Sequence, residues 1–315
     1  MIKNWQQQLT TKAAEWGLPA GDRWTFLLHN NYQPTASTIN LLWFYGQEAF
    51  PRAVTKMASD HDILAREYRN LQEVYSVAHS HVPRPLSLGE SDGFTMLWME
   101  GVPGLRISGR YSKGLLVELS EMLVSIHRAV RREAQEPASR RHARLIAEPL
   151  AAVISHGDSA TVGRGCAAVL EEATVDCVAQ LPVIPQHGDL YLDNVVRHRD
   201  QIHVVDWENF GVNDLPYYDL LTLLISFLRA SSAKTKEWDP RLRKQIPDLI
   251  DGYAQALDIP RSTVRVMLPI TLANWFHLHW SERRPAAEVM YAVLEDYFEN
   301  QAHWQETFLG KGARV

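Results

Sequence analysis

Cysteine is scarce in this sequence, which has only two, Cys166 and Cys177, among 315 residues. They stand eleven residues apart in a segment with a helical pattern, and this spacing would place both on one helical face about three turns apart. That separation is too long for a disulfide bond. We therefore expect two buried free thiols. Because structural disulfides are rare in reducing compartments, we also expect a cytoplasmic location.

Long hydrophobic runs and an excess of basic residues are also lacking. The longest apolar stretches, such as residues 220–228, are too short to cross a bilayer, and the first residues lack the apolar core of a secretory signal. The net charge is -5. Nucleic-acid-binding proteins typically have a stripe of Lys and Arg that alternates with aromatic residues, and this sequence has none. We expect neither a membrane nor a nucleic-acid partner.

A cluster of polar residues in the middle of the chain has the composition of a metal-phosphate centre. Asp189 is followed five residues later by Asn194, and Asp206 stands at the end of an apolar run. Two valine pairs, at 195–196 and 204–205, predict a short hairpin that brings Asn194 and Asp206 side by side. One carboxylate would then orient a hydroxyl and accept its proton, while an amide oxygen and a second carboxylate hold Mg²⁺. The alternative is a hairpin that merely carries surface carboxylates.

This segment resembles the catalytic loop and metal-binding aspartate of the aminoglycoside phosphotransferase and choline kinase-like family of small-molecule kinases. Residues 187–189, His-Gly-Asp, together with Asn194 match the loop, and residues 206–208, Asp-Trp-Glu, stand where protein kinases have Asp-Phe-Gly. Asp219 matches an aspartate that braces the catalytic loop from the start of the next helix. The set is specific in combination, whereas each piece alone would be a weak signal.

The resemblance gives each matched residue a role. Asp189 would be the catalytic base, with His187 beside it in the loop, and Asp219 would provide structural support. Asn194 and Asp206 would hold the Mg²⁺ that neutralises the phosphates of ATP or GTP.

The resemblance also implies an α+β, bilobal protein-kinase-like fold. A nucleotide-binding lobe, residues 1–101, would contain a small antiparallel sheet with one main helix. A larger, mainly helical lobe, residues 102–315, would contain the catalytic loop and the acceptor pocket. The apolar content of 46% and charged content of 22% are those of an ordinary globular protein. The patterns predict strands at residues 24–28, 38–45, 52–57, 85–88 and 94–99 and a helix over residues 62–78.

Within the expected small lobe, Lys56 resembles the strand lysine that binds nucleotide phosphates. Such a lysine needs a carboxylate to hold it, and Glu67 on the following helix is the best partner, with Glu73 as the alternative. Taken singly, a lysine on a strand and a glutamate on a helix are usually solvated surface residues.

Residues 95–104 resemble the strand and linker that join the two kinase lobes. The resemblance implies that main-chain groups of Glu100 and Val102 pair with adenine and that Met99 borders the base. An ordinary strand that ends in a Pro-Gly turn is the alternative.

Two departures from the protein-kinase pattern bear on substrates. No glycine-rich phosphate loop lies between residues 24 and 45, so Ser37, Thr38 and nearby backbone amides are the candidates for phosphate contact. Only twelve residues separate Asp206 from Asp219, which leaves no room for a peptide-docking segment. A small-molecule acceptor is therefore favoured over a protein.

The region after Asp219 is expected to shape the acceptor pocket. Its aromatic and polar residues suit a sugar or polyol, although core packing explains a Trp and Phe stripe equally well. The candidate pocket residues are Glu208, Trp275, His279, Trp280 and Glu282.

Together these features predict a kinase, monomeric or homodimeric, that transfers the γ-phosphate of ATP or GTP to a small-molecule hydroxyl. The acceptor would be a sugar, amino sugar, aminoglycoside or amino alcohol. A non-catalytic nucleotide-binding scaffold or sensor on the same fold is the first alternative, and transfer of an adenylyl group is the second.

Overall fold

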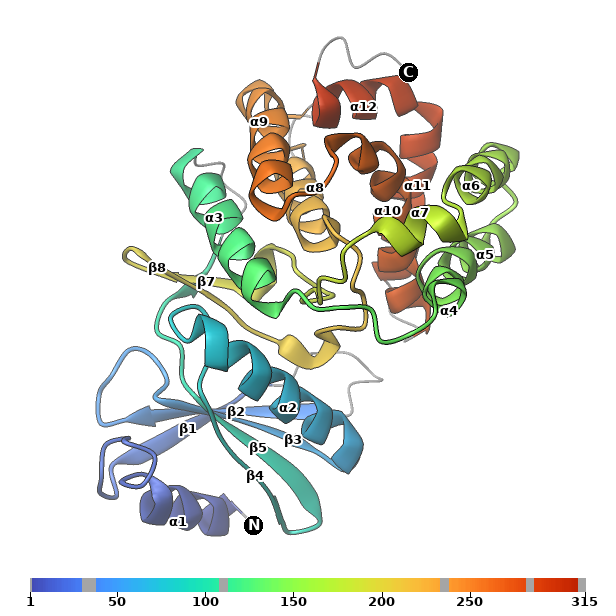
Figure 1. Cartoon of the computed structure of the whole chain (residues 1–315). Helices are drawn as coiled ribbons and strands as arrows, with labels where there is room; N and C mark the ends of the chain where they lie inside the picture. The colour runs from blue at the N-terminus through green and yellow to red at the C-terminus, as the bar shows by residue number, and fades with distance from the viewer. Residues whose placement is uncertain (1, 30–37, 108–112, 233–237, 282–285, 311–315) are drawn as a thin grey trace. The chain divides into compact units, whose positions relative to one another are not determined.

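The chain forms two compact units. The computed structural model describes residues 2–29, 38–107, 113–232, 238–281 and 286–310 (Figure 1). The first unit contains Met1–Ile107 and Asp193–Phe210, and the second contains Ser108–Leu192 and Gly211–Val315. Residues 193–210, which carry the two predicted metal ligands, therefore belong with the N-terminal strands. The sequence predicted a single boundary after residue 101, and its assignment of a role to each lobe stays a prediction.

The first unit is built on a five-stranded antiparallel sheet with the strand order β1-β2-β3-β5-β4. The central strand, β3, pairs with both β2 and β5 along its whole length. All five strands were predicted from the sequence, with ends that differ by no more than three residues. The strands are β1 (Trp24–His29), β2 (Thr38–Tyr45), β3 (Ala53–Ala58), β4 (Pro85–Ser91) and β5 (Phe94–Glu100).

Tryptophan side chains fill the core between helix α1 (Ile2–Lys12) and this sheet. Trp43 of β2 and Trp98 of β5 stack with ring centroids 5.8 Å apart, and Trp16 packs on Trp98 at 5.5 Å. The indole N–H of Trp43 donates a hydrogen bond to the Thr55 hydroxyl at 2.8 Å, so the polar edge of this buried ring is satisfied. This packing fixes the backbone of β3 from one side.

Helix α2 (His61–Ala78) presents one buried face to the same unit. Asp60 caps its first turn, since its carboxylate accepts a hydrogen bond from the Asp62 N–H at 2.9 Å. Glu67 is the charged member of the buried face, and a buried carboxylate is rare without a partner. The face consists of Leu64, Glu67, Leu71, Val74 and Ala78.

A second, three-stranded sheet contains the hairpin that the valine pairs predicted. Its strands are β6 (Leu105–Arg106), β7 (Val195–His198) and β8 (Gln201–Val204), in the order β6-β7-β8. Just beyond the hairpin's paired ends, the Val205 N–H donates a hydrogen bond to the Asn194 carbonyl at 3.0 Å. Asn194 therefore lies next to the chain segment that leads into Asp206.

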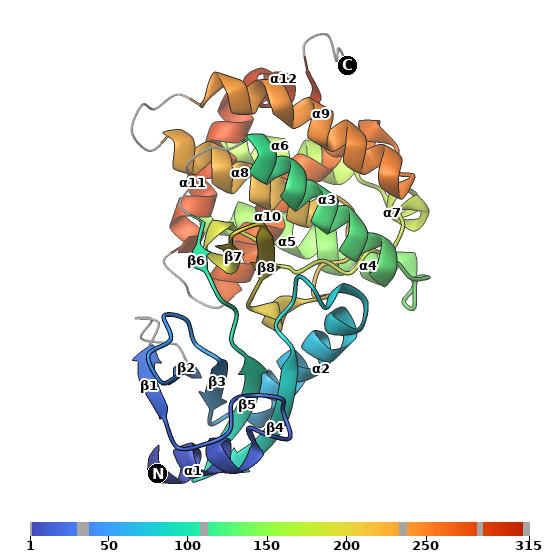
Figure 2. The ribbon, with the colours of Figure 1, turned by 90° about the vertical axis from the view of Figure 1, so that its left-hand side faces the viewer.

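The second unit is helical in the part that the structure describes, as predicted (Figures 1 and 2). Helix α8 packs against α3, α9 and α10, and most of its side chains are buried, so it lies in the core. The described helices include none that is long and apolar enough to cross a bilayer. They are α3 (Lys113–Val130), α4 (Ala138–His142), α5 (Glu148–His156), α6 (Ala160–Glu172), α7 (Val175–Gln180), α8 (Tyr218–Ser232), α9 (Pro240–Leu257), α10 (Val264–Ser281), α11 (Ala286–Glu299) and α12 (Gln301–Leu309).

The two cysteines differ from the expectation of a shared helical face. Helix α6 ends at Glu172, and the Thr174 side chain caps a new helix, α7, by accepting a hydrogen bond from the Cys177 N–H at 3.3 Å. Both thiols are free, as predicted, but only Cys166 is buried. Burial raises the pKa of the Cys166 thiol to about 12, so this residue is the less reactive of the pair at neutral pH.

We predict that Gly101→Ala destabilises the first unit. A Cβ at residue 101 would lie 2.1 Å from the Pro51 carbonyl oxygen, while the Gly101 N–H is fixed by a 2.8 Å hydrogen bond to the Arg52 carbonyl. Relief of this clash requires backbone movement, and we expect a loss of about 1–3 kcal/mol in the free energy of unfolding, measured by urea denaturation. Gly89→Ala is the control, because nothing lies within 4 Å of its Cβ position. Equal stability of the two variants would contradict the prediction.

Candidate active site

Lys56 lies at the centre of a partly buried ionic cluster in the first unit. It projects from β3, where it pairs with Asn40 of β2 and Leu97 of β5. Its ammonium donates hydrogen bonds of 2.6 Å to Glu67 and of 2.6 Å to Asp206. The structure therefore brings together three of the residues that the sequence singled out. The alternative partner of Lys56, Glu73, is an exposed residue of α2.

This cluster contains more acidic side chains than basic ones. Burial by itself would lower the pKa of the Lys56 ammonium, but the nearby carboxylates of Asp206, Glu67 and Glu208 raise it above its usual value. Burial raises the pKa of the Glu67 carboxyl, and the neighbouring carboxylates add to the increase against the opposing effect of Lys56. Because three carboxylates surround one ammonium, a further cation would stabilise the cluster.

Glu208 belongs to this cluster as well. Glu67, Asp206 and Glu208 each have one carboxylate oxygen that lies within 4.8 Å of the other two. The sequence placed Glu208 in the acceptor pocket, whereas in the first unit it lies with the metal candidates. Its position two residues after Asp206, at the end of an apolar strand, was the signal that could have assigned it here.

The backbone holds Asp206 in a turn suited to a metal ligand. Asp206 has φ = 72°, in the left-handed region that non-glycine residues rarely occupy. The turn is tied to α2, because the Asn70 side-chain amide donates to the Trp207 carbonyl at 2.9 Å and the Glu208 carbonyl at 3.3 Å. Asn194 is 4% exposed and is anchored by Val205 as described above. Carboxylate and amide oxygens are the ligands that Mg²⁺ prefers, so this donor set fits the ion.

The predicted nucleotide-linker residues occupy the end of β5 and the segment after it. Met99 is buried, and the Glu100 carboxylate accepts a 3.0 Å hydrogen bond from Arg84. Val102 follows the strand. Thr38 is the first residue of β2, and Ser37 lies outside the described residues.

In the second unit, Asp219 braces the catalytic-loop segment as the resemblance implied. Its carboxylate, at the start of α8, accepts hydrogen bonds from the His187 N–H at 2.6 Å and the Gly188 N–H at 3.1 Å. His127 Nε2 lies 3.2 Å from the same carboxylate. Gly188 has φ = 88°, a conformation that favours glycine. All these polar groups are buried, so the peptide before Asp189 is held in one orientation.

His187 acts on Asp189 through the backbone. Its ring Nδ1 accepts a hydrogen bond from the Asp189 N–H at 3.3 Å. The His187 side chain is 1% exposed, which suits a positioning role rather than contact with substrate.

The predicted acceptor residues on α10 separate into two groups. His279 Nε2 lies 3.8 Å from Asp189 Oδ1, and the Trp275 ring lies one helical turn earlier, 6.4 Å from the His279 ring. Trp280 instead packs against His156 at 4.5 Å and Phe276 at 5.9 Å. Glu282 lies outside the described residues.

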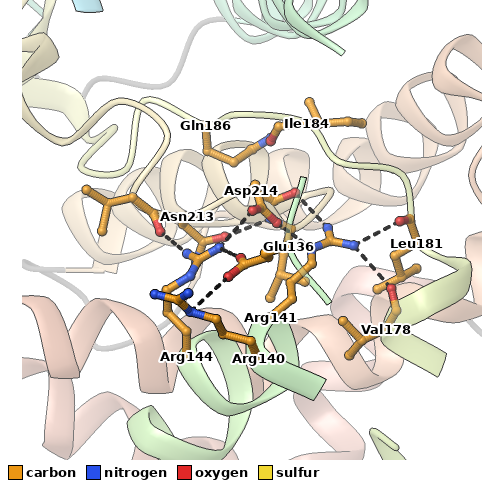
Figure 3. Close-up of polar contacts among 12 residues, drawn as sticks. Glu136, Arg140, Arg141, Arg144, Val178, Leu181, Ile184, Gln186, Asn213 and Asp214 are labelled. Carbon is orange, nitrogen blue, oxygen red and sulfur yellow. Dashed lines mark hydrogen bonds and ion pairs between the residues drawn. The ribbon is translucent and has the colours of Figure 1, made fainter. Parts of the chain in front are cut away.

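A buried arginine that the sequence analysis missed supports this part of the second unit (Figure 3). Arg141 is 2% exposed, and its Nε donates a 2.6 Å hydrogen bond to the Asp214 carboxylate. The rest of its guanidinium is satisfied by the carbonyls of Val178, Leu181, Pro182 and Asp214, at 3.0–3.1 Å. Arg144 donates to the other Asp214 oxygen at 2.9 Å.

Asp214 connects this arginine to the catalytic-loop segment. The Ile184 N–H donates to the Asp214 carbonyl at 3.0 Å, and the Gln186 N–H donates to the Asn213 carbonyl at 2.9 Å. The Gln186 side-chain oxygen in turn accepts from the Asp219 N–H at 3.0 Å. Arg141 therefore helps to position the chain directly before His187. No motif spacing marked it, because its partner is 73 residues away.

With this geometry established, comparison with known proteins identifies the family. A family model described as the phosphotransferase enzyme family (APH) matches residues 33–259. The chain belongs to this family. The match includes every residue from Lys56 to Asp219 discussed above, and it ends before α10. No curated protein matches the sequence significantly.

Solved structures of family kinases share the fold. An amicoumacin kinase in complex with AMP-PNP, Ca²⁺ and Ami is 15% identical over 96% of both chains, with a TM-score of 0.60. A glucosamine kinase in complex with glucosamine, ADP and inorganic phosphate is 16% identical over 95% of this chain and 87% of its own, with a TM-score of 0.58. The aminoglycoside phosphotransferase APH(4)-Ia is 14% identical over 95% and 99%, with a TM-score of 0.57. At these identities the likeness establishes the protein-kinase-like fold predicted from the sequence.

We predict that Arg141→Met destabilises the second unit by about 2–4 kcal/mol, because one Asp214 carboxylate oxygen and four carbonyls lose their donor while Arg144 still pairs with Asp214. The free energy of unfolding by urea measures this change. Arg140→Met is the matched control on the same helix, since the Arg140 side chain is 80% exposed and its contact with Glu136 is 3.8 Å long. That variant is expected to stay within about 0.5 kcal/mol of the wild type. Similar losses in both variants would refute the assignment.

Proposed function

We propose that this protein is a phosphotransferase that moves the γ-phosphate of ATP or GTP to a hydroxyl group of a small molecule. The observation that carries the proposal is the contact of Lys56 with both Glu67 and Asp206 in a member of this family. A lysine held by a carboxylate binds nucleotide phosphates, and a nearby aspartate holds their metal ion.

In this proposal the residues of the catalytic-loop segment act on the acceptor. Asp189 orients the hydroxyl and accepts its proton as the oxygen bonds to phosphorus. The bond from the γ-phosphorus to the oxygen that bridges it to the β-phosphate breaks, and the nucleoside diphosphate leaves. The Asp219 carboxylate and the His187 ring fix the backbone from which Asp189 projects.

The ionic cluster of Lys56, Glu67, Asp206 and Glu208, here called the lysine cluster, would bind the nucleotide. Lys56 binds phosphate oxygens while Glu67 keeps the ammonium in place. Asn194 and Asp206 are the proposed Mg²⁺ ligands, with Glu208 as a further oxygen donor. Mg²⁺, when bound, neutralises negative charge on the phosphates. Main-chain groups of Glu100 and Val102 would pair with adenine and Met99 would border the base, while Thr38 and Ser37 are the candidates for phosphate contact.

Ligands in structures of similar fold support these choices. The amicoumacin kinase structure contains AMP-PNP and Ca²⁺, the glucosamine kinase structure contains ADP, and another aminoglycoside phosphotransferase structure contains GDP. The acceptors in such structures, among them glucosamine and hygromycin B, are small molecules. The proposal retains a monomeric or homodimeric state and a cytoplasmic location.

We expect Asp189→Ala to lower turnover by at least about a hundredfold while leaving nucleotide binding largely intact, because only proton transfer and hydroxyl orientation are removed. Phosphorylation of a metabolite and antibiotic panel with γ-labelled ATP measures turnover, and calorimetry with AMP-PNP measures binding. Unchanged phosphorylation of an accepted substrate would overturn the assignment of the base.

Asp206→Ala, unlike Asp189→Ala, should weaken nucleotide binding. Loss of this carboxylate should weaken Mg²⁺-dependent AMP-PNP binding by about tenfold or more, because a charge-assisted contact is removed. Asp200→Ala, at the exposed hairpin turn between β7 and β8, is the control. If AMP-PNP binds Asp206→Ala and wild type equally well in the presence of Mg²⁺, Asp206 is not a ligand of the metal.

A further inference from the structure

A histidine of α10 lies close to the proposed base. His279 Nε2 and Asp189 Oδ1 are 3.8 Å apart, which is longer than a direct hydrogen bond. Both side chains are less than 10% exposed, so both are largely shielded from solvent. Two adjacent hydroxyl oxygens of one ligand are close enough together for each to bond one of these side-chain atoms.

Trp275 provides a second and independent observation. It lies four residues before His279 and therefore on the same face of α10. Trp275 is 4% exposed, and its indole N–H has no hydrogen-bond partner among the described residues. Buried polar groups in folded proteins normally have partners. An indole N–H is only a donor, so the missing partner must offer a lone pair.

The indole N–H of Trp275 limits which chemical groups of a phosphate acceptor can bond to it. A hydroxyl oxygen has lone pairs that can accept from an indole N–H, whereas an ammonium group has none. His279 can donate or accept, depending on its tautomer, and so can serve a hydroxyl in either direction. The pair therefore suits a molecule with several hydroxyls better than an amino alcohol that has one hydroxyl and an ammonium group.

We propose that His279 and Trp275 bind the phosphate acceptor, and that this acceptor is a polyol with vicinal hydroxyls. This inference rests on the proposed phosphotransferase function. One hydroxyl donates to Asp189 and becomes the nucleophile, its neighbour bonds His279, and a further oxygen accepts from Trp275. Because His279 bonds the neighbouring hydroxyl, the lone pairs of the attacking oxygen stay available for the phosphorus.

These two residues lie outside the region that the family model matches. The family match ends at residue 259, before α10 begins at Val264. The matched region thus accounts for nucleotide and base residues, and α10 supplies the part that selects the acceptor.

The experiment compares acceptors and variants in the full-length protein with γ-labelled ATP and Mg²⁺. The probes are D-glucose and myo-inositol, deoxy analogues that each lack one vicinal hydroxyl, and the amino alcohols choline and ethanolamine. We expect the wild type to phosphorylate a polyol with kcat/KM at least about tenfold above its deoxy analogue, the effect of one hydrogen bond. His279→Ala should raise the KM for the polyol about tenfold and remove the preference over the deoxy analogue, while the KM for ATP stays unchanged.

Two further variants separate recognition from folding. Trp275→Phe removes the N–H and keeps an aromatic ring, so it should raise the polyol KM without a change in melting temperature. His277→Ala is the matched control, because His277 is on the same helix and Trp275 and His279 lie on a different face. It should behave as the wild type.

Preference for choline or ethanolamine would overturn the inference while leaving the phosphotransferase function intact. So would a His279→Ala protein with an unchanged polyol KM and an unchanged preference over the deoxy analogue. If ATP binds but the wild type transfers phosphate to none of the probes or to the wider metabolite and antibiotic panel, the proposed function itself fails, and the inference fails with it.

Discussion

The contacts of the partly buried Lys56 ammonium are those on which the first unit's candidate site depends. Two carboxylates, Glu67 and Asp206, contact it at 2.6 Å each, and they come from segments far apart in the sequence. Without the positive charge, these acidic side chains would repel one another in a poorly solvated place. Lys56 therefore joins the sheet, helix α2 and the turn after β8 into one arrangement. The net negative charge that remains favours the binding of a further cation.

In the second unit, backbone N–H groups rather than an ammonium hold the buried carboxylate. The Asp219 carboxylate receives two consecutive N–H groups, and Gln186 links its backbone to the preceding segment. Arg141 and Asp214 secure that segment from the other side. A charged residue held by several short, buried hydrogen bonds has little freedom to reorient. Asp189 thus projects from a backbone that is fixed in advance, which is the main contribution a protein can make to phosphoryl transfer.

Sequence reasoning succeeded where local pattern and chemistry coincide. The strands of the first sheet and the hairpin followed from alternation and turn residues, whereas the Lys56–Glu67 pair and the Asp219 contact followed from the resemblance to the kinase family. It failed where the decisive contact joins distant segments without a motif. Arg141 meets Asp214 only through the tertiary fold, and Cys177 became exposed because Thr174 starts a new helix. Glu208 was identified as a functional residue but assigned to the acceptor pocket, although its position two residues after Asp206 could have placed it with the metal candidates.

The central claim is that the lysine cluster and Asp189 serve one reaction, the transfer of a γ-phosphate to a hydroxyl. The most direct measurement is a phosphorus NMR time course of the wild-type protein with ATP, Mg²⁺ and the compounds of the metabolite and antibiotic panel. The account predicts that a phosphomonoester signal grows in step with the signals of ADP. A signal from an adenylylated acceptor together with pyrophosphate, or ATP that binds and remains unconsumed, would contradict it.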